Sequence, residues 1–328
     1  MNKNLIPLFK WSGGKRRELE HVSKHLPESF ERYCEPFVGG GAVWFALNHG
    51  ENIIGDANDE VINFYKIVKE HKGAFIDDLN SWSRFYMAGI AALKPIMDAN
   101  KVKPNTMDKK IWKKQKREEF KLLGDIYYFW RDGRHTTEYD LAKRFYVLRN
   151  LAFGGMLRYS RDGKFNIPYG YYKNFKTLKW NENYDNIFDN TTFFSGDWQD
   201  TVEGLSSDDF VFLDPPYTRA FTKYSPTGDF TKEDHRELAE WFRSKKAKAM
   251  IILNKDEFTT RLYGDFIKEE YPFSYGIRYK KKKEKDILFT VPWHYDADTR
   301  ERYGEYVSEL ELEPKEAYEA EHFVATNY

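Results

Sequence analysis

Residues 33–41 read YCEPFVGGG, and this stretch with its neighbours decides the fold class. Its apolar start predicts a short strand that runs into a turn of three glycines, and residues 42–48 behind the turn predict a helix. A second short strand, residues 53–54, leads to Asp56. A strand, a glycine turn, a helix and a strand that ends in an acid are typical of the opening of a doubly wound α/β sheet.

The strand pattern returns in the second half of the chain. Residues 192–195, 210–213 and 249–253 are apolar or β-branched runs of strand length, and the first two lead to Asp197 and Asp214. Sites in open α/β sheets lie at the carboxyl ends of the strands, so we expect both acids near a site.

Two local motifs mark element boundaries in the same half. Residues 231–234, TKED, match a capping box and predict the start of a helix. Residues 275–279 and 287–291 flank four lysines at 280–283, which is typical of a hairpin with a basic tip.

A helical segment separates the two halves of the sheet. Residues 74–150 predict mainly helix, with breaks near Pro104 and Gly133. Residues 151–180 are rich in glycine and tyrosine and predict loop and hairpin.

These patterns predict the domain organisation. We expect residues 1–73 and 181–295 to form one sheet domain, with residues 74–180 as a helical, basic insertion. Residues 296–328 carry 3 basic and 10 acidic residues, and we expect an acidic extension that forms an exposed helix.

The formal net charge is zero, but the charges are unevenly distributed. Residues 101–180 carry 20 Lys and Arg against 8 Asp and Glu, whereas residues 181–328 carry 20 against 31. A local basic excess suits a polyanion, because phosphate contacts are made locally, although a solvated helical face explains it equally well. The aromatic residues of the same segment suit stacking on bases.

Composition excludes several classes of protein. The chain has no apolar run of membrane-spanning length and no apolar stretch near its start that suits a secretory signal. Its single cysteine, Cys34, excludes a disulfide framework and a thiolate metal cluster, and the eight histidines lack ligand spacing. We therefore expect a cytoplasmic protein that binds neither a metal nor a membrane.

Residues 214–217 read DPPY directly after the strand at 210–213. This motif suits methyl transfer to an exocyclic amine on an aromatic ring, because such an amine needs oriented acceptors for its two N–H bonds. We expect the carboxylate of Asp214 and the carbonyl of Pro215 to accept them. The ring of Pro216 restrains this backbone, and Tyr217 offers a flat face for the base.

The methyl donor must be a sulfonium, and the glycine turn lets the backbone approach such a ligand closely. Asp56 lies 17 residues beyond Gly39 and is placed to accept from ribose hydroxyls. A nicotinamide or flavin site would need G-x-G-x-x-G, but Trp44 stands where the third glycine belongs. A phosphate-binding loop fails as well, because Arg16 follows Lys15 where Ser or Thr is required.

With these motifs in order, the chain resembles the Dam-type (α-group, D12 class) DNA adenine-N6 methyltransferases over most of residues 8–293. The resemblance rests on FKWSGGK at 9–15, EPFVGGG at 35–41, GDAN at 55–58, the segment 149–172 and DPPY at 214–217. It implies a Rossmann-like, mostly parallel, seven-stranded methyltransferase sheet with an inserted target-recognition region, and S-adenosylmethionine as the donor. The DNA substrate is then double-stranded, with a GATC-like or related short target.

The resemblance also implies roles for individual residues. The donor-binding positions are Trp11, Gly13, Gly14, Lys15, Glu35, Phe37, Gly39, Gly41, Asp56, Asp197 and Asp214. The catalytic positions are Asp214, Pro215, Pro216 and Tyr217. The DNA-binding positions are Lys10, Phe153, Gly155, Arg158, Pro168 and Tyr172.

Among the DNA-binding positions, Arg158 is expected to bind a guanine through a bidentate fork, and Phe153 to wedge into the gap left by a flipped base. Lys10 matches a position that contacts a guanine in the family. Gly154 and Tyr171 depart from the family's pattern, so the exact target stays open.

Three alternatives remain beside adenine methylation of DNA. The acceptor could be cytosine N4 or an adenine in RNA, although Asp rather than Ser before the two prolines favours adenine. The chain could also be a DNA-binding protein without catalysis. A zinc-dependent deaminase is excluded, because it needs a cysteine pair. We expect a monomer. Whether a cognate restriction endonuclease accompanies the protein stays open.

Overall fold

The computed structural model describes residues 5–99, 117–160, 163–217, 230–281 and 312–328. The chain divides into two compact units. Met1–Ile62 and Asn183–Tyr328 form the first unit, and Asn63–Glu182 forms the second. The insertion expected at residues 74–180 thus falls inside the second unit, which begins earlier in the chain than the sequence pattern indicates.

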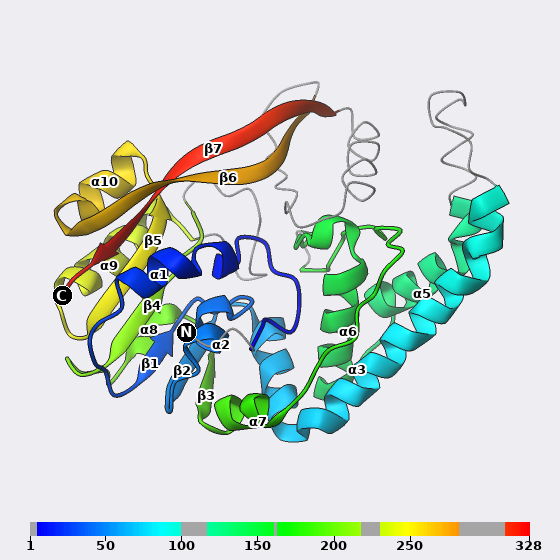
Figure 1. Cartoon of the computed structure of the whole chain (residues 1–328), viewed down its shortest axis with the longest axis horizontal. Coiled ribbons are helices and arrows are strands. Elements are labelled where there is room, and N and C mark those ends of the chain that lie inside the picture. The colour runs from blue at the N-terminus through cyan, green and yellow to red at the C-terminus, as the bar shows by residue number, and fades with distance from the viewer. Residues whose placement is uncertain (1–4, 100–116, 161–162, 218–229, 282–311) are drawn as a thin grey trace. The chain divides into compact units, whose positions relative to one another are not determined.

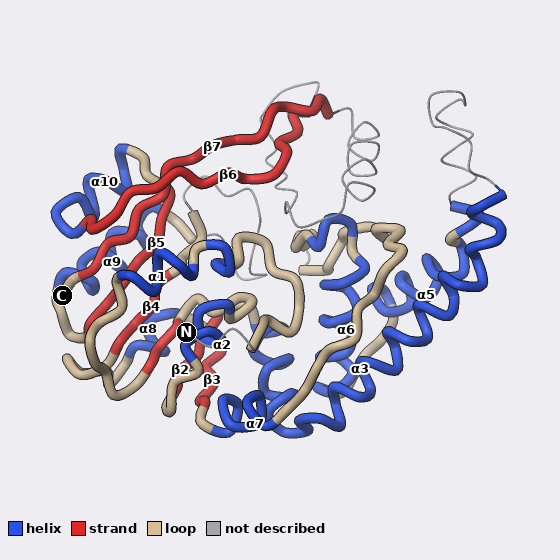
Figure 2. Tube along the Cα trace, in the orientation of Figure 1, coloured by secondary structure: helices blue, strands red, loops and turns tan. Residues whose placement is uncertain are grey.

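A mixed sheet forms the centre of the first unit (Figures 1 and 2). In the described part of the chain it has seven strands, in the order β3-β2-β1-β4-β5-β7-β6. Neighbouring strands are parallel except that β7 is antiparallel to both β5 and β6. The bounds are β1 Tyr33–Glu35, β2 Asn52–Asp56, β3 Thr191–Ser195, β4 Phe210–Leu213, β5 Lys248–Asn254, β6 Ile267–Lys281 and β7 Leu312–Thr326. The α/β class with a seven-stranded sheet, as predicted, is confirmed.

The central strands are buried because helices cover both faces of the sheet. All four residues of β4 and the five central residues of β5 are buried, as continuous apolar runs in parallel strands require. Helix α9 (Lys232–Arg243) contributes Leu238, Ala239 and Phe242 to the core under these strands. Thr231 and Asp234 cap this helix reciprocally, which confirms the predicted capping box.

Short helices connect the strands and place loops at their carboxyl ends. These helices are η1 (Lys15–Arg17), α1 (Leu19–Lys24), α2 (Ala42–Leu47), α7 (Glu182–Asp189), α8 (Trp198–Val202), α10 (Glu257–Tyr263) and η4 (Gly264–Phe266). The predicted helix behind the glycine turn corresponds to α2.

The C-terminal end of the chain differs from the prediction. Tyr275 pairs with Tyr318 and Tyr279 with Pro314, so residues 275–279 pair with β7, a partner that the sequence did not predict. Residues 287–291 lie outside the described residues.

The expectation of an exposed helix at the acidic end is wrong for residues 312–326, which form β7. The acidic composition hides a short apolar run, Phe323, Val324 and Ala325, which is completely buried between β5 and β6. This run has a strand on each side, and tertiary burial therefore outweighs the local charge pattern.

The second unit is helical. Its helices are α3 (Asp59–Ala99, which begins in the first unit), α5 (Lys121–Asp132), α6 (Glu138–Leu151) and the short η3 (Phe153–Gly155). The backbone of Lys72 is not helical (φ 50°, ψ −130°), so α3 is kinked there. Gly133 ends α5, as the sequence predicts, whereas Pro104 lies outside the described residues.

The segment after α6 is a loop with isolated β-bridges, in agreement with the predicted loop and hairpin. Ala152 pairs with Tyr169 and Tyr159 with Phe165, both antiparallel. The hydroxyl of Tyr127 donates to the carbonyl of Ile167 at 2.8 Å and ties this segment to α5.

Burial of β7 makes a prediction about stability. Phe323→Ala removes a fully buried ring from the central sheet and should lower the free energy of unfolding by about 3–5 kcal/mol. Phe194→Ala on the edge strand β3, where the ring is 37% exposed, is the matched control and should cost less than about 1 kcal/mol. Urea denaturation followed by circular dichroism measures both. Equal, small losses would mean that β7 does not belong to the folded core.

Candidate active site

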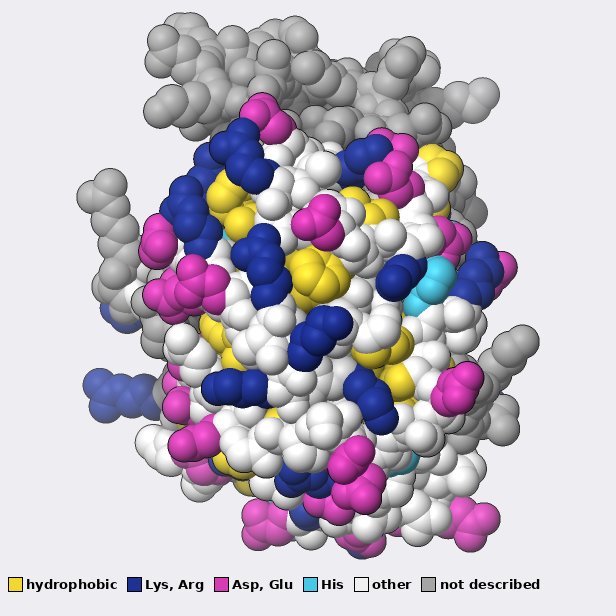
Figure 3. Space-filling model, turned by 90° about the vertical axis from the view of Figure 1, so that its left-hand side faces the viewer, with side chains coloured by type: hydrophobic (Ala, Val, Ile, Leu, Met, Phe, Trp, Pro, Cys, Tyr) yellow, Lys and Arg dark blue, Asp and Glu magenta, His cyan; other side chains and the backbone are white. Residues whose placement is uncertain are grey.

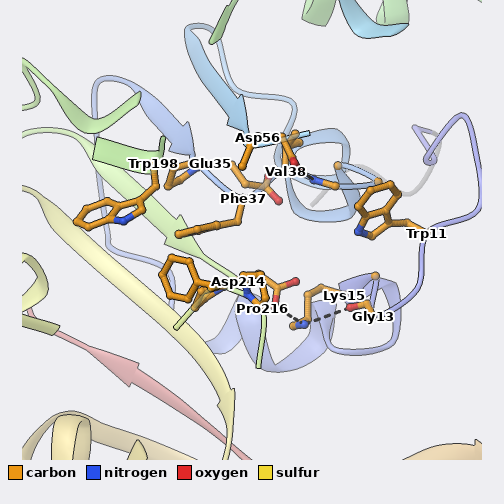
Figure 4. Close-up of a pocket in the computed structure, with 18 of the residues that line it drawn as sticks. Trp11, Gly13, Lys15, Glu35, Phe37, Val38, Asp56, Trp198, Asp214 and Pro216 are labelled. Carbon is orange, nitrogen blue, oxygen red and sulfur yellow. Dashed lines mark hydrogen bonds and ion pairs between the residues drawn. The ribbon is translucent and has the colours of Figure 1, made fainter. Parts of the chain in front are cut away.

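Loops at the carboxyl ends of β1, β2, β3 and β4 meet at a cavity of about 420 Å³ in the first unit (Figure 4). Every residue that the sequence assigns to the donor or to catalysis lines this cavity. The lining also contains residues that the sequence did not single out: Ser12, Pro36, Val38, Gly40, Ala42, Ala57, Trp198, Gln199, Phe230, Asp234 and Glu237.

The glycine turn forms one wall of the cavity, and its backbone leaves no room for other residue types. Gly39 and Gly41 have φ angles of +45° and +67°, in the left-handed region that favours glycine. A Cβ atom on Gly39 would lie 2.3 Å from Nε1 of Trp11. Trp11 therefore packs directly on the turn, and the N-terminal motif and the glycine motif form one surface.

Asp56 fixes the position of this turn. Its Oδ2 accepts from the backbone N–H of Gly39 and its Oδ1 from that of Asn58, both at 2.8 Å. Burial raises the pKa of Asp56 to about 6, although these two hydrogen bonds act in the opposite direction. Contact with a ribose, predicted from the sequence, stays a prediction.

An ion pair between Lys15 and Asp214 lies on the other side of the cavity (Figure 4). Nζ of Lys15 is 2.5 Å from Oδ1 of Asp214 and also donates to the carbonyl of Gly13 at 3.2 Å. The Lys15 side chain is 4% exposed and the Asp214 side chain 20%. Burial raises the pKa of Asp214 to about 6 against the opposing effect of Lys15, so the carboxyl is mainly ionised at neutral pH.

Glu35 and Asp197 have local partners that the sequence alone did not specify. Oε2 of Glu35 accepts from the hydroxyl of Tyr33 at 2.7 Å and from the backbone N–H of Trp44 at 3.0 Å. Burial raises the pKa of Glu35 to about 8, so this carboxyl is largely neutral at pH 7. Asp197 caps α8 through the N–H of Gln199 and also lines the cavity, and its contact with the donor stays a prediction.

Sequence reasoning missed His235 of α9, which holds the DPPY backbone. Its Nε2 lies 3.0 Å from the carbonyl oxygen of Pro216, and a carbonyl only accepts, so Nε2 carries the proton. Burial lowers the pKa of His235 to about 4, which keeps the ring neutral. The only sequence signal for His235 was its position in the first turn of the helix predicted to start at residues 231–234.

A buried polar group beneath the cavity was missed as well. Glu18 directly precedes α1, Tyr271 belongs to β6 and His322 to β7. Glu18 contacts both of the others, and it also lies near Lys15. No periodicity or motif relates these positions, because Glu18 is more than 250 residues away from both Tyr271 and His322 in the chain.

None of the DNA-binding candidates is among the residues that line this cavity. Lys10 belongs to the first unit and is half-buried. The other candidates belong to the second unit: Phe153, Gly155 and Tyr172 are buried there, Pro168 is half-buried, and Arg158 is exposed.

Arg158 is held on its hairpin by Asn166. Its Nε donates to Oδ1 of Asn166 at 2.7 Å and its Nη2 to the carbonyl of the same residue at 3.4 Å. Phe153 would have to leave its buried position to act as a wedge, and that role stays a prediction.

The cavity fits a charged nucleoside donor such as S-adenosylmethionine. Its volume lies in the range of small-molecule pockets, and aromatic side chains supply apolar walls. Asp56 and Asp214 supply carboxylates, and the glycine turn supplies a backbone surface without side chains. Among the described residues, no cluster of three or more His, Cys, Asp or Glu could hold a metal ion, and no helix has the length and apolarity needed to cross a membrane.

The glycine turn provides a test of the cavity. Gly39→Ala forces a Cβ into Trp11 and should weaken binding of S-adenosylmethionine at least about tenfold by calorimetry. Gly204→Ala is the matched control, because Gly204 also has a positive φ (+72°) but has no neighbour within 4 Å of the added Cβ. The control should lose stability and keep its affinity. Unchanged donor affinity in Gly39→Ala would remove the turn from the site.

Comparison with known proteins agrees with this geometry. Residues 11–283 match the family described as D12 class N6 adenine-specific DNA methyltransferase. The type II methyltransferase M.CviBI of Paramecium bursaria Chlorella virus NC1A is 31% identical over 290 residues, which cover 87% of this chain and 96% of the relative. M.MjaIII of Methanocaldococcus jannaschii is 30% identical (87% and 97% covered), and the DNA adenine methylase of Haemophilus influenzae 29% (78% and 82%). The chain therefore belongs to the D12 class of S-adenosylmethionine-dependent, N6 adenine-specific DNA methyltransferases.

Proposed function

We propose that this methyltransferase acts on an adenine that is flipped out of a short, GATC-like or related duplex target, and that the DPPY motif holds this base. The observation that carries the proposal is the Lys15–Asp214 ion pair in the cavity, with the rest of the motif beside it. A paired adenine hides its N6 amine inside the duplex, so extrusion is needed before methyl transfer.

The chemistry of N6 explains why an acceptor is needed more than a base. The lone pair of this amine is delocalised into the purine ring, which makes it a poor nucleophile. S-adenosylmethionine, when bound, supplies an electrophilic methyl group. Asp214 accepts one N–H and the Pro215 carbonyl accepts the other, which orients the lone pair toward the methyl group.

Two contacts prepare the motif for this task. Lys15 favours the ionised form of Asp214, which accepts but does not donate, and so matches an amine hydrogen. His235 holds the Pro216 carbonyl and restrains the backbone next to Pro215. The acceptors are thereby oriented before the base arrives, which reduces the reorganisation needed in the reaction.

The Tyr217 ring is a suitable surface for the flipped base. Nζ of Lys15 lies 5.2 Å from the centre of this ring, and the His322 ring meets it edge-on at 5.7 Å. Stacking of a base on an aromatic ring contributes about 1–3 kcal/mol. This is comparable with the few kcal/mol that extrusion costs.

Methylation of cytosine N4, methylation of adenine in RNA and DNA binding without catalysis are weaker candidates. The family is specific for adenine N6 in DNA, which disfavours cytosine N4 and RNA. A protein that only binds DNA would have no use for a buried lysine and aspartate in a donor-sized cavity.

Substitution of Asp214 tests the proposed role of the motif. Asp214→Ala should lower methyl transfer to duplex DNA at least about 10²–10³-fold, because an oriented group at the reacting atoms is lost. Transfer of labelled methyl groups, followed by digestion to nucleosides, measures both the rate and the identity of the product. Asp200→Ala, on the exposed side of α8, is the control and should leave the rate unchanged. Equal incorporation by wild type and Asp214→Ala would exclude the motif from catalysis.

We propose that Arg158, with Lys10 and Pro168, recognises the target. Arg158 is exposed on a hairpin, and its guanidinium already makes a two-nitrogen contact to Asn166, a geometry that also suits guanine O6 and N7. The basic excess of residues 101–180 suits the phosphates. By contrast, the face of the first unit with α9 and α10 shows Lys and Arg interspersed with Asp and Glu (Figure 3).

Base recognition and phosphate binding are separable by mutation. Arg158→Ala should reduce the preference for the target over a site with one altered base pair by about 1–3 kcal/mol. Lys164→Ala, an exposed residue of the same hairpin, should weaken binding to all sequences alike and lessen the salt dependence. Fluorescence anisotropy with the two duplexes at several salt concentrations measures this. An Arg158→Ala variant with full discrimination would assign that side chain to the phosphates.

We also propose that the protein acts as a cytoplasmic monomer beside a restriction endonuclease with the same target. Two relatives named type II methyltransferases support the endonuclease. Light scattering of the purified protein tests the monomer. Sequencing of host DNA after expression identifies the target.

A further inference from the structure

Glu18 is a buried acid beside the donor cavity that the reaction above does not use. It is 2% exposed and lies between η1 and α1. Its Oε2 accepts from the Tyr271 hydroxyl at 2.6 Å and from Nδ1 of His322 at 2.7 Å. Its Oε1 lies 3.9 Å from Nζ of Lys15. Lys15 is therefore placed between two carboxylates, Asp214 at 2.5 Å and Glu18.

Glu18 stays ionised in this position. Burial by itself would raise its pKa, but Lys15, His322 and Tyr271 together outweigh burial and hold the pKa below its ordinary value. His322 stays neutral, because burial lowers its pKa. The carboxylate is thus a permanent negative charge at neutral pH.

The formal charges at this end of the cavity do not cancel. Lys15 contributes +1, while Asp214 and Glu18 contribute −1 each, which leaves −1. Glu35, the next acid along the wall, is largely neutral because its pKa is about 8.

The two arginines next to Lys15 alter this balance little. Arg16 and Arg17 on the same turn are exposed, so water screens their charge. Asp56 adds a further negative charge on the other side of the cavity, where two backbone N–H groups bind it.

We propose that Glu18 is a specificity-determining residue for the methyl donor: by sharing Lys15 with Asp214 it leaves a net negative charge beside the cavity, which favours the sulfonium donor over its neutral thioether product. The inference rests on the donor cavity proposed above. In a partly buried site one unit charge acts with an effective dielectric far below that of water. Loss of the Glu18 charge should therefore change the preference about tenfold.

A purely structural role for Glu18 predicts a different result. Through Lys15 and His322 it also supports the Tyr217 ring, and loss of that support would weaken both ligands to a similar extent. The ratio of the two affinities therefore separates the electrostatic role from the structural one.

The experiment is calorimetry on the full-length protein without DNA. The ligands are S-adenosylmethionine, S-adenosylhomocysteine and sinefungin, an analogue in which a charged amine stands at the position of the sulfonium. Glu18→Gln keeps the shape and removes the charge, and should weaken binding of the two cationic ligands about tenfold relative to the thioether. Glu257→Gln on the exposed surface of α10 removes the same charge elsewhere and should leave the ratio as in wild type.

A second pair of variants keeps the test decisive. Tyr271→Phe removes one hydrogen bond to Glu18 but keeps the charge, and should preserve the wild-type ratio. If Glu18→Gln does not fold, Glu18→Leu with Tyr271→Phe replaces the buried polar contact by apolar surface and should show the same tenfold change. An unchanged ratio in a folded variant that lacks the Glu18 charge overturns the proposal.

The outcome also distinguishes this proposal from the donor cavity itself. If wild type binds none of the three ligands, or if Gly39→Ala binds them as well as wild type does, the cavity is wrong. If wild type binds them and the charge-free variants keep its ratio, the cavity stands and only the role of Glu18 fails.

Discussion

The ion pair between Lys15 and Asp214 is the interaction on which the site depends. It joins the turn before α1 to the carboxyl end of β4, positions separated by 199 residues of sequence. Both side chains are largely out of water, where either charge alone would be costly. A site that loses one partner must protonate or neutralise the other, and its acceptor geometry is then lost. The pair therefore couples the stability of this corner of the fold to its chemistry.

The glycine turn and Trp11 form the wall of the cavity that lies opposite this ion pair. Because Gly39 has no side chain, the Trp11 ring lies directly on the turn, and Asp56 holds the turn from the other side. Rigid backbone N–H groups and an aromatic ring thus define one wall, and the ion pair defines the opposite one (Figure 4). Small shifts of either wall would change the fit of a ligand. The ends of the strands limit such shifts, because the sheet holds them rigidly.

The cavity was predictable because its residues follow directly after strands that the sequence pattern predicts. Each predicted acid or glycine follows a strand, and parallel strands bring their carboxyl ends to one edge of the sheet. Asp56, Asp197 and Asp214 are therefore expected at the same edge, and all three line the cavity. The partners of these residues were not predictable in the same way. Glu18 meets His322 only because β7 inserts between β5 and β6, and the acidic composition around β7 concealed its apolar run. Long-range polar contacts of this kind leave no periodic signal.

The charges around Asp214 are compatible with both roles proposed for its carboxyl, binding of the donor and catalysis. Burial raises its pKa to about 6 and Lys15 opposes this shift, so at neutral pH a fraction of the protein still carries a protonated Asp214. A positive ligand in the cavity favours the ionised form further, because its charge lowers the pKa of Asp214 by the same Coulomb effect. Asp214 is therefore most completely ionised when the donor is bound, which is when an acceptor is needed. Methyl transfer breaks the bond between sulfur and the methyl group and moves the positive charge to N6, which then loses a proton. The remaining thioether is neutral, so its attraction to Asp214 is weaker.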